Sequence, residues 1–471
     1  MSIKRRKFIK QSSLVSMGFF GLQTFVNSCK TNPGSGINSF PEKLSTGYGP
    51  LLEDPEGLLN LPKGFSYKVI SKRGNPMIDG FLVPGNPDGM ATFAAPNGHV
   101  VIVRNHEISP GDLNNAAFGT DMSLLDKLPQ SGFYDFGRGK QPCLGGTTTI
   151  VYNTENQEVI HEYLSLTGTV RNCAGGLTPW GSWISCEENT SVANDVLEKD
   201  HGYNFEVPAQ VEPILANPAP IKAMGRFNHE AVCVEPGSGI VYQTEDRHDG
   251  LIYRYLPNTP GKLLDGGQLQ VLSIKSNPSF DTRNWEELTS GKMEIGKEYE
   301  VEWLNIDQVE SPEDDLRFRG YDKGAARFAR GEGMWYGNNE VYFACTNGGM
   351  KKQGQVFKYK PSPNEGQPQE DNQPGKLTLM VEPNNIDIVT NCDNLTVANN
   401  GHLILCEDRP TPRIVGISPK GEMYHIAKNI GVKSEFAGST FSPDGSTLFV
   451  NIQVAGLTLA ITGPWGEDWS A

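Results

Sequence analysis

Several familiar catalytic signatures are missing from this chain of 471 residues. It has no Gly-x-Ser-x-Gly nucleophile elbow, no glycine-rich loop ending in Lys-Ser/Thr, no His-Glu-x-x-His and no paired Cys-x-x-Cys pattern. Its eight histidines do not cluster along the sequence. These absences argue against an α/β-type serine hydrolase, a P-loop nucleotide-binding protein, a zinc peptidase and a small zinc-binding module.

Positive charge is also scarce. The chain has 41 Lys and Arg against 55 Asp and Glu, for a net charge of −14. Residues 1–28 hold five of the basic residues and no acidic one, so the remainder has a net charge near −19. This excess of negative charge argues against nucleic acid as a partner. It suits a protein that gathers cations, although an acidic soluble surface gives the same charge.

Long apolar runs are few, and the clearest one lies at the N-terminus. Lys4-Arg-Arg-Lys-Phe-Ile-Lys10 precedes an apolar stretch of about thirteen residues, 14–26, which is short for a membrane span. We therefore interpret residues 1–28 as an export signal, and the paired Arg5-Arg6 favours the twin-arginine route for folded proteins.

The residues after the signal predict how the protein is held outside the cytoplasm. Val26-Asn-Ser-Cys29 is similar to a lipoprotein cleavage box, so we expect lipidation at Cys29, with plain cleavage nearby as the alternative. Residues 29–45, rich in Gly, Ser, Asn and Pro, are expected to form a flexible tether. The prediction is a periplasmic protein or an outer-membrane or cell-surface lipoprotein, whose only contact with the membrane is this anchor.

Six copies of a strand–turn–strand pattern, each of about twenty residues, follow the tether. Their turns carry Gly, Pro, Asn and Asp, which supply the backbone angles of tight hairpins. Such repeats cannot bury their faces alone, so they predict an all-β fold, a six-bladed β-propeller with inter-blade insertions, as a single domain over residues 46–471. The copies begin Asp88-Gly-Met-Ala, Cys173-Ala-Gly-Gly, Asn228-His-Glu-Ala, Gly331-Glu-Gly-Met, Cys392-Asp-Asn-Leu and Phe436-Ala-Gly-Ser.

Carboxylates gather at the ends of these hairpins. Crowded buried carboxylates repel one another and lose hydration, so they require either raised pKa values or a cation. Oxygen ligands fit calcium or ferric iron, and a thiolate beside them fits a transition metal; a turn or capping role is the alternative for any single acid. The candidates at the strand starts and ends are Asp88, Glu107, Glu230, Glu332, Asp393 and Glu407.

Arg330 is the candidate for binding an anion next to these metals. It lies two residues before Glu332, and on an extended segment that spacing places both side chains on one face. The arginine fork matches two oxygens of a tetrahedral oxyanion. The alternative is that Arg330 only neutralises nearby acids.

Longer segments of the chain resemble a known family, the PhoX-type alkaline phosphatases. The resemblance covers nearly all of residues 46–471 in the same order. The matching segments are Leu61-Pro-Lys-Gly-Phe, Pro87-Asp-Gly-Met, Arg104-Asn-His-Glu, Asn172-Cys-Ala-Gly-Gly-Leu-Thr-Pro-Trp-Gly-Ser-Trp-Ile-Ser-Cys-Glu-Glu, His201-Gly-Tyr-Asn-Phe-Glu-Val, Gly225-Arg-Phe-Asn-His-Glu-Ala, Arg330-Gly-Glu-Gly-Met and Phe441-Ser-Pro-Asp-Gly-Ser-Thr-Leu-Phe-Val-Asn-Ile-Gln.

The resemblance implies a phosphatase with two Fe³⁺ ions and two or three Ca²⁺ ions. It implies that Cys186 and Glu187 bind iron and that Arg330, beside Glu332, holds phosphate, with Glu230 and Glu245 as further metal ligands. Which ligands bind iron and which bind calcium stays open.

The expected function is hydrolysis of phosphomonoesters outside the cytoplasm by a monomer whose partners are small phosphate esters. Two alternatives remain from the sequence. One is a propeller hydrolase that uses calcium alone on phosphodiesters, phytate or lactones. The other is a non-catalytic surface binding module.

Overall fold

The structure, a computed structural model, describes residues 44–289 and 291–466. The predicted export signal, Cys29 and almost all of the tether lie outside these residues. Where the structure describes the chain, no helix is long and apolar enough to cross a membrane. One α-helix, α1 (Leu316–Lys323), accompanies strands β1 to β26 there.

The strands form five antiparallel sheets. A six-stranded sheet has the order β1-β2-β23-β22-β21-β20 and a three-stranded sheet the order β10-β9-β8. A nine-stranded sheet has the order β11-β12-β13-β14-β15-β19-β18-β17-β16, and two four-stranded sheets have the orders β24-β25-β26-β3 and β4-β5-β6-β7. In chain order the strands are β1 Leu51–Leu52, β2 Leu59–Pro62, β3 Ser66–Lys72, β4 Pro87–Ala94, β5 His99–His106, β6 Gly145–Asn153, β7 Glu158–Thr169, β8 Asn172–Leu177, β9 Ser182–Glu187, β10 Asn204–Pro208, β11 His229–Val234, β12 Val241–Glu245, β13 Ile252–Pro257, β14 Gly267–Ile274, β15 Glu298–Asn305, β16 Gly331–Gly337, β17 Glu340–Cys345, β18 Gln355–Lys360, β19 Lys376–Val381, β20 Cys392–Val397, β21 Leu403–Glu407, β22 Arg413–Ile417, β23 Met423–Asn429, β24 Phe436–Phe441, β25 Thr447–Ile452 and β26 Leu457–Thr462.

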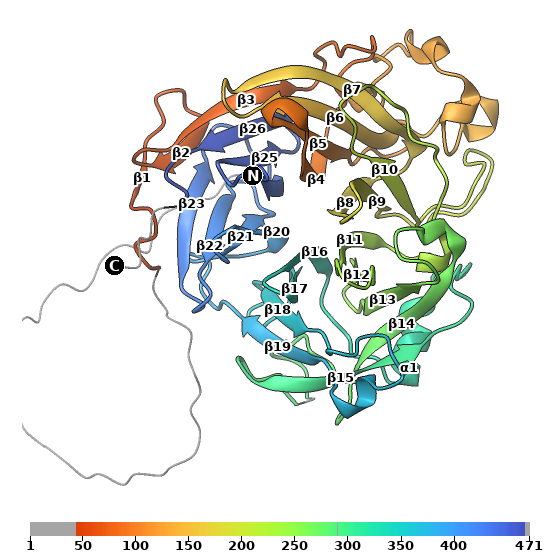
Figure 1. The fold of residues 1–471 in the computed structure, drawn as a ribbon, viewed down its shortest axis with the longest axis vertical. Coiled ribbons are helices and arrows are strands. Elements are labelled where there is room, and N and C mark those ends of the chain that lie inside the picture. Colours follow the sequence, from red (N-terminus) through yellow and green to blue (C-terminus); the bar gives the residue numbers. More distant parts are fainter. Residues whose placement is uncertain (1–43, 290, 467–471) are drawn as a thin grey trace, which may run out of the picture. The chain divides into compact units, whose positions relative to one another are not determined.

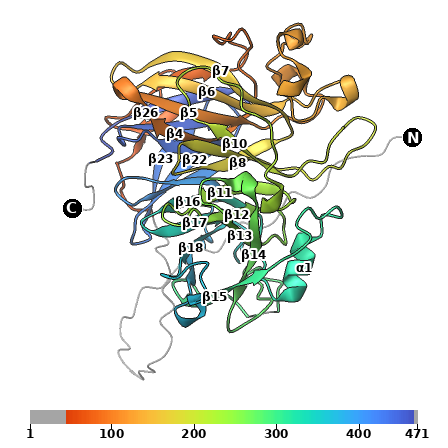
Figure 2. The ribbon, with the colours of Figure 1, turned by 45° about the vertical axis from the view of Figure 1, so that its right-hand side comes forward.

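The sheets are arranged like the blades of a propeller around one centre (Figure 1). The strands nearest the centre are β4, β8, β11, β16, β20 and β24; each contacts the next, and β24 contacts β4. The nine-stranded sheet doubles back, because its two end strands, β11 and β16, contact each other. The all-β, propeller-like fold expected from the repeats is therefore confirmed, and the turned view in Figure 2 shows α1 to one side of the strands.

Strands from the two ends of the described chain share sheets. β3 pairs with β26 from Ser66↔Thr462 to Lys72↔Leu457, and β2 pairs with β23. A ring of sheets has no free edge where its first and last strands pair, so this pairing closes the ring. The hairpin turns carry the predicted residues: Asn338 and Asn339, between β16 and β17, both have positive φ, 53° and 61°.

Every innermost strand has a β-bulge near its first residue. In β4, for example, Pro87 pairs with His106 and Met90 pairs with Arg104. Between these two pairs, β4 has two residues and β5 has one, so β4 carries one extra residue. β8, β11, β16, β20 and β24 show the same shift in register. A bulge re-aims the side chain of its extra residue, so these six bulges control what points toward the centre at this end of the strands.

Apolar clusters between the sheets hold the ring together. Small residues let neighbouring innermost strands approach closely: a Cβ on Gly438, which has φ 64°, would lie 2.2 Å from the carbonyl oxygen of Asp88. A Cβ on Gly333 would lie 2.6 Å from Asn394 Cα. All seven cysteines within the described ranges are unpaired.

Candidate metal centre

The starts of the six innermost strands surround a cavity of about 200 Å³. Nine carboxylates line it, against only two arginines and one thiol. Further along the same strands, the space shrinks to about 20 Å³ between small and apolar residues. The cavity is lined by Asp88, Glu107, Arg171, Cys173, Glu188, Glu230, Asp246, Arg330, Glu332, Asp393, Asp408, Glu435 and Gln453.

Five of these side chains belong to the bulges of the innermost strands, and we call them the bulge residues: Asp88, Cys173, Glu230, Glu332 and Asp393. The sixth bulge, in β24, has Gly438 at this position and so adds no side chain. Four of the five were predicted from the sequence as metal ligands, and the structure brings them together at the cavity. Cys173 is the addition.

A second set comes from the residue that follows the neighbouring strand in five of the six hairpins. We call these the strand-end residues: Glu107, Glu188, Asp246, Asp408 and Gln453. Gln453 donates one hydrogen bond to Asp88 at 2.6 Å and another to Glu107 at 2.9 Å, which ties the last hairpin to the first. Of this set, the sequence prediction named only Glu107.

Three other predicted ligands, Glu187, Glu245 and Glu407, do not line the cavity. Each is fully buried one residue before a strand-end residue. Side chains alternate between opposite faces of a strand, so neighbouring acids point in opposite directions. Glu187 accepts the backbone N–H of Val170 at 2.9 Å, and Glu407 accepts that of Thr390 at 2.8 Å, so these carboxylates anchor loops.

Glu245 is anchored in the same way. It accepts the backbone N–H of Leu251 and the hydroxyl of Tyr253, and it faces Arg317 across 3.7 Å. The neighbouring acids Glu188, Asp246 and Asp408 line the cavity in place of these three.

Cys186 also lies away from the cavity. It is fully buried in the same apolar cluster as Met224 and Phe227. Burial, with the charge of Glu230, raises the pKa of its thiol well above the usual value. Cys173 lies instead among the carboxylates, where one ligand atom from each of Asp88, Glu107 and Cys173 falls within 4.8 Å of the others.

Aligning the six repeats on their pairing register would have found these residues. Cys173 occupies the same position in its repeat as Asp88 and Glu230 in theirs. Each strand end can be read as a pair of residues, which is His106-Glu107 in the first repeat and Ile452-Gln453 in the last. In both pairs only the second residue is a carboxylate or an amide, so the second residue is the one expected at the cavity. Three other repeats have an acid at both positions of the pair, so their sequences alone do not show which acid lines the cavity.

Glu230 is the cavity carboxylate with the fewest partners. It is 1 % exposed, and neither carboxylate oxygen has a hydrogen-bond partner among the described residues. Burial and the charge of Glu332 raise its pKa well above the usual value. Burial likewise raises the pKa values of Asp88, Glu332 and Asp393, helped by their acidic neighbours. A buried carboxylate with no donor is costly unless it holds a proton or binds a cation.

The possible ligand atoms form three overlapping groups. Asp88 and Glu107 join Cys173; Cys173 joins Glu188 and Glu230; and Glu230 joins Glu332 and Asp393. Within each group the atoms lie within 4.8 Å of one another. Cys173 and Glu230 each belong to two groups, so the arrangement can hold several neighbouring cations that share ligands.

Two arginines stand where the cavity opens. The side chain of Arg330 is 30 % exposed and that of Arg171 is 34 % exposed, whereas that of Glu332 is 5 % exposed. Arg330 binds Asp246 at 2.8 and 3.0 Å and Glu332 at 2.8 Å. Arg171 binds Glu107 and Glu188, both at 2.5 Å.

Both arginines hold an unusual backbone conformation. They occupy one position of the repeat, just before the innermost strand, with φ of 48° for Arg171 and 54° for Arg330. Asn86 and Asn391 take that position in two other repeats, at 44° and 51°. Asparagine enters this left-handed region more readily than arginine does. Arginine is therefore a less favourable choice for the backbone at these two positions, which directs attention to what its side chain does.

Comparison with known proteins shows the family. A family described as "Alkaline phosphatase PhoX" matches residues 46–456. No curated protein matches the sequence. PhoX of Pseudomonas fluorescens, solved in complex with vanadate, a transition state analogue, has a TM-score of 0.62 at 17 % identity, over 86 % of this chain and 96 % of that one.

A second solved structure is more distant. XC5397 of Xanthomonas campestris, described as a gluconolactonase, has a TM-score of 0.34 at 11 % identity, over 84 % of this chain and 98 % of that one. The family match spans most of the sequence and both sets of cavity residues up to Gln453. The chain therefore belongs to the PhoX alkaline phosphatase family, whose members are metal-dependent hydrolases of phosphate monoesters.

Proposed function

We propose that the cavity holds two Fe³⁺ ions and two or three Ca²⁺ ions, and that it releases inorganic phosphate from small phosphomonoesters. The unpartnered carboxylate of Glu230, set among nine cavity acids, is the observation that carries this proposal. Cys173 would ligate iron, because a thiolate is a soft ligand that suits a transition metal. The carboxylates that bind no arginine suit calcium or ferric iron.

When bound, these cations would act as Lewis acids on the phosphoryl oxygens and would lower the pKa of a bound water. The protein's own residues do the rest. Arg330 lines the cavity and is held by Asp246 and Glu332, so its position is set before the substrate arrives.

The bonds of Arg330 to Asp246 and Glu332 use Nε and Nη2, so within the described residues Nη1 is left to bind a phosphoryl oxygen. Arg171 donates in the same pattern, from Nε to the Glu188 carbonyl and from Nη2 to two carboxylates. We infer that the remaining Nη1 groups of the two arginines bind the transferring phosphoryl group and stabilise its developing charge.

Three further parts of the proposal rest on the sequence and on the ring of strands. The nine-stranded sheet is interpreted as two blades joined edge to edge, which gives six blades in all. The paired Arg5-Arg6 supports twin-arginine export of the folded protein, and Cys29 supports a lipid anchor at the periplasmic or cell surface. The enzyme is proposed to act as a monomer on small esters, without nucleic acid.

Removal of the metals tests the proposal directly. A strong chelator is expected to abolish hydrolysis of an aryl phosphate and to lower the melting temperature, because nine cavity carboxylates then lose their counter-charge. Elemental analysis before and after treatment measures the metals lost, and adding Fe³⁺ and Ca²⁺ back separately shows which of them restores activity. Full activity in protein free of iron would refute the di-iron assignment and favour a calcium-only enzyme.

Arg171 provides a second test, on a residue that the sequence prediction did not include. We expect Arg171→Asn to lower kcat/KM by about 10- to 100-fold through loss of one phosphate-binding fork. The fold should be retained, since Asn86 and Asn391 already occupy the equivalent position. Steady-state assays give the rate and circular dichroism gives the melting temperature. An unchanged kcat/KM would restrict Arg171 to pairing with Glu107 and Glu188.

A further inference from the structure

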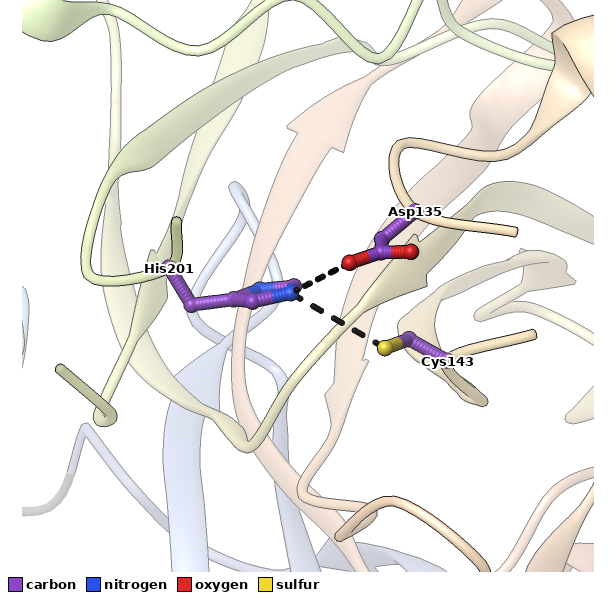
Figure 3. A group of neighbouring side chains, drawn as sticks. All are labelled: Asp135, Cys143 and His201. Carbon is purple, nitrogen blue, oxygen red and sulfur yellow. Dashed lines mark hydrogen bonds and ion pairs between the residues drawn. The ribbon is translucent and has the colours of Figure 1, made fainter. Parts of the chain in front are cut away.

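A second group of possible ligands lies outside the cavity. Asp135, Cys143 and His201 each offer one ligand atom, and the three atoms lie within 4.8 Å of one another. Figure 3 shows Nε2 of His201 directed at both partners. It lies 3.3 Å from Asp135 Oδ2 and 3.8 Å from Cys143 Sγ. None of the three residues lines the cavity.

The group is closed to solvent. His201 and Asp135 are 0 % exposed and Cys143 is 1 % exposed. Burial also raises the pKa of the Cys143 thiol. A buried, protonated thiol that no substrate can reach is not a nucleophile, so the resemblance of a Cys–His–acid arrangement to a catalytic triad does not apply here.

The histidine is held in the orientation typical of metal-binding histidines. Its Nδ1 lies 2.6 Å from Glu187 Oε1, and Glu187 is itself fixed by the backbone N–H groups of Val170 and Gly202, both at 2.9 Å. A carboxylate on one ring nitrogen fixes the tautomer and directs the other nitrogen at the metal. Glu187, predicted as a ligand of the main centre, would therefore orient a ligand of this one.

Asp135 is fixed just as firmly. Its Oδ1 accepts the backbone N–H of Gly137 at 2.7 Å, and its Oδ2 accepts those of Glu198 and Lys199 at 2.9 and 3.0 Å. These three backbone donors stabilise the charged form of the carboxylate. The charged form needed for ligation is already present.

The two distances from His201 Nε2 are those of hydrogen bonds, and they are also compatible with coordination of a shared cation. For a tetrahedral zinc ion with bonds of about 2.0–2.2 Å to N and O and 2.3 Å to S, the N···O edge is about 3.4 Å and the N···S edge about 3.6 Å. The observed 3.3 and 3.8 Å lie close to both. A charge-assisted hydrogen bond between nitrogen and a carboxylate is shorter, as the 2.6 Å contact to Glu187 is.

We propose that Asp135, Cys143 and His201 form a separate binding site for one divalent transition-metal cation of the zinc type. Mixed N, O and S ligands favour such a cation over calcium. Binding replaces the proton on Nε2 and the proton on Sγ, so two protons leave as two positive charges enter and the charge of the buried group is unchanged. The site joins the connections 107–144 and 188–203, which carry Asp135, Cys143 and His201.

Cobalt spectroscopy tests this site without reliance on activity. In the Cys173→Ala background, the main centre has no thiolate, so a thiolate-to-cobalt absorption band after loading with Co²⁺ would come from Cys143. We expect the band in Cys173→Ala and its loss in the double variant Cys173→Ala/Cys143→Ala. Absence of the band in fully loaded, folded Cys173→Ala protein would overturn the site and leave His201 as an imidazolium between two carboxylates.

Zinc content provides an independent measurement. After loading with zinc and removal of weakly bound ions, the wild type should hold one equivalent more than Cys143→Ala, while iron and calcium stay the same in both. Zinc affinity should fall by at least about 100-fold in Cys143→Ala. Equal zinc content in the two proteins would contradict the proposal, and circular dichroism shows whether each variant is folded.

Discussion

Replacing Arg330 with asparagine is expected to lower kcat/KM for an aryl phosphate by about 10³-fold. Arg330 lines the cavity with a partly exposed side chain, and its bonds to Asp246 and Glu332 hold it in place. An asparagine is too short to reach the same phosphoryl oxygens and carries no charge. Steady-state kinetics measures the loss, and elemental analysis should find the metal content near that of the wild type.

Asparagine is chosen because the backbone accepts it. Arg330 has φ 54°, and Asn86 and Asn391 hold the same position of their repeats at 44° and 51°. The substitution therefore adds no strain, so lost activity can be separated from misfolding. Arg330→Lys would keep the charge but lose the two-pronged geometry, and an intermediate rate would assign part of the effect to the fork.

A surface arginine serves as the matched control. Arg319 lies on α1 and pairs with Asp315 at 2.9 Å, outside the cavity. Arg319→Ala should change kcat/KM by less than about twofold, since an exposed ion pair contributes little. A variant Arg330→Asn with normal metal content could instead lose less than about tenfold in kcat/KM. Arg330 would then only neutralise nearby acids, and Arg171 and the cations would bind the phosphate.

The all-β, propeller-like fold could be predicted from the repeated hairpins and their turn residues. Asn338-Asn339 forms the predicted tight turn because asparagine tolerates positive φ, and that preference is local. The joining of two units into one nine-stranded sheet depends on the contact of β15 with β19, far apart in the chain. No local pattern reports such a contact, so the number of sheets could not be read from the sequence.

The candidate site was predicted to within one residue at three strand ends. Glu187-Glu188, Glu245-Asp246 and Glu407-Asp408 each carry two acids, and only the alternation of the strand decides which one faces the cavity. Hairpin register and bulges set that alternation, and both are properties of strand pairing rather than of composition. The acidic bulge residues were found because each stands at the start of a repeat, and Arg330 because it lies two residues before Glu332.

The two cysteines near β8 and β9 give the sharpest test of this placement. Cys173→Ser should remove bound iron and lower activity by more than about 10³-fold, because Cys173 lies within 4.8 Å of ligand atoms from four carboxylates in two groups. Cys186→Ser should leave the metals in place and keep activity within about twofold. Its effect should instead be on stability.

The loss of stability expected for Cys186→Ser follows from the position of the new hydroxyl group. Cys186 is fully buried in an apolar cluster with Met224 and Phe227, so a serine there places a polar group among apolar neighbours at a cost of about 1–3 kcal/mol. Chemical denaturation measures that loss, and elemental analysis with any visible absorption measures the iron. If iron were lost with Cys186→Ser and kept with Cys173→Ser, the thiolate ligand would be Cys186, as the family resemblance first implied. The cavity would then have to extend past the bulge of β8 toward β9.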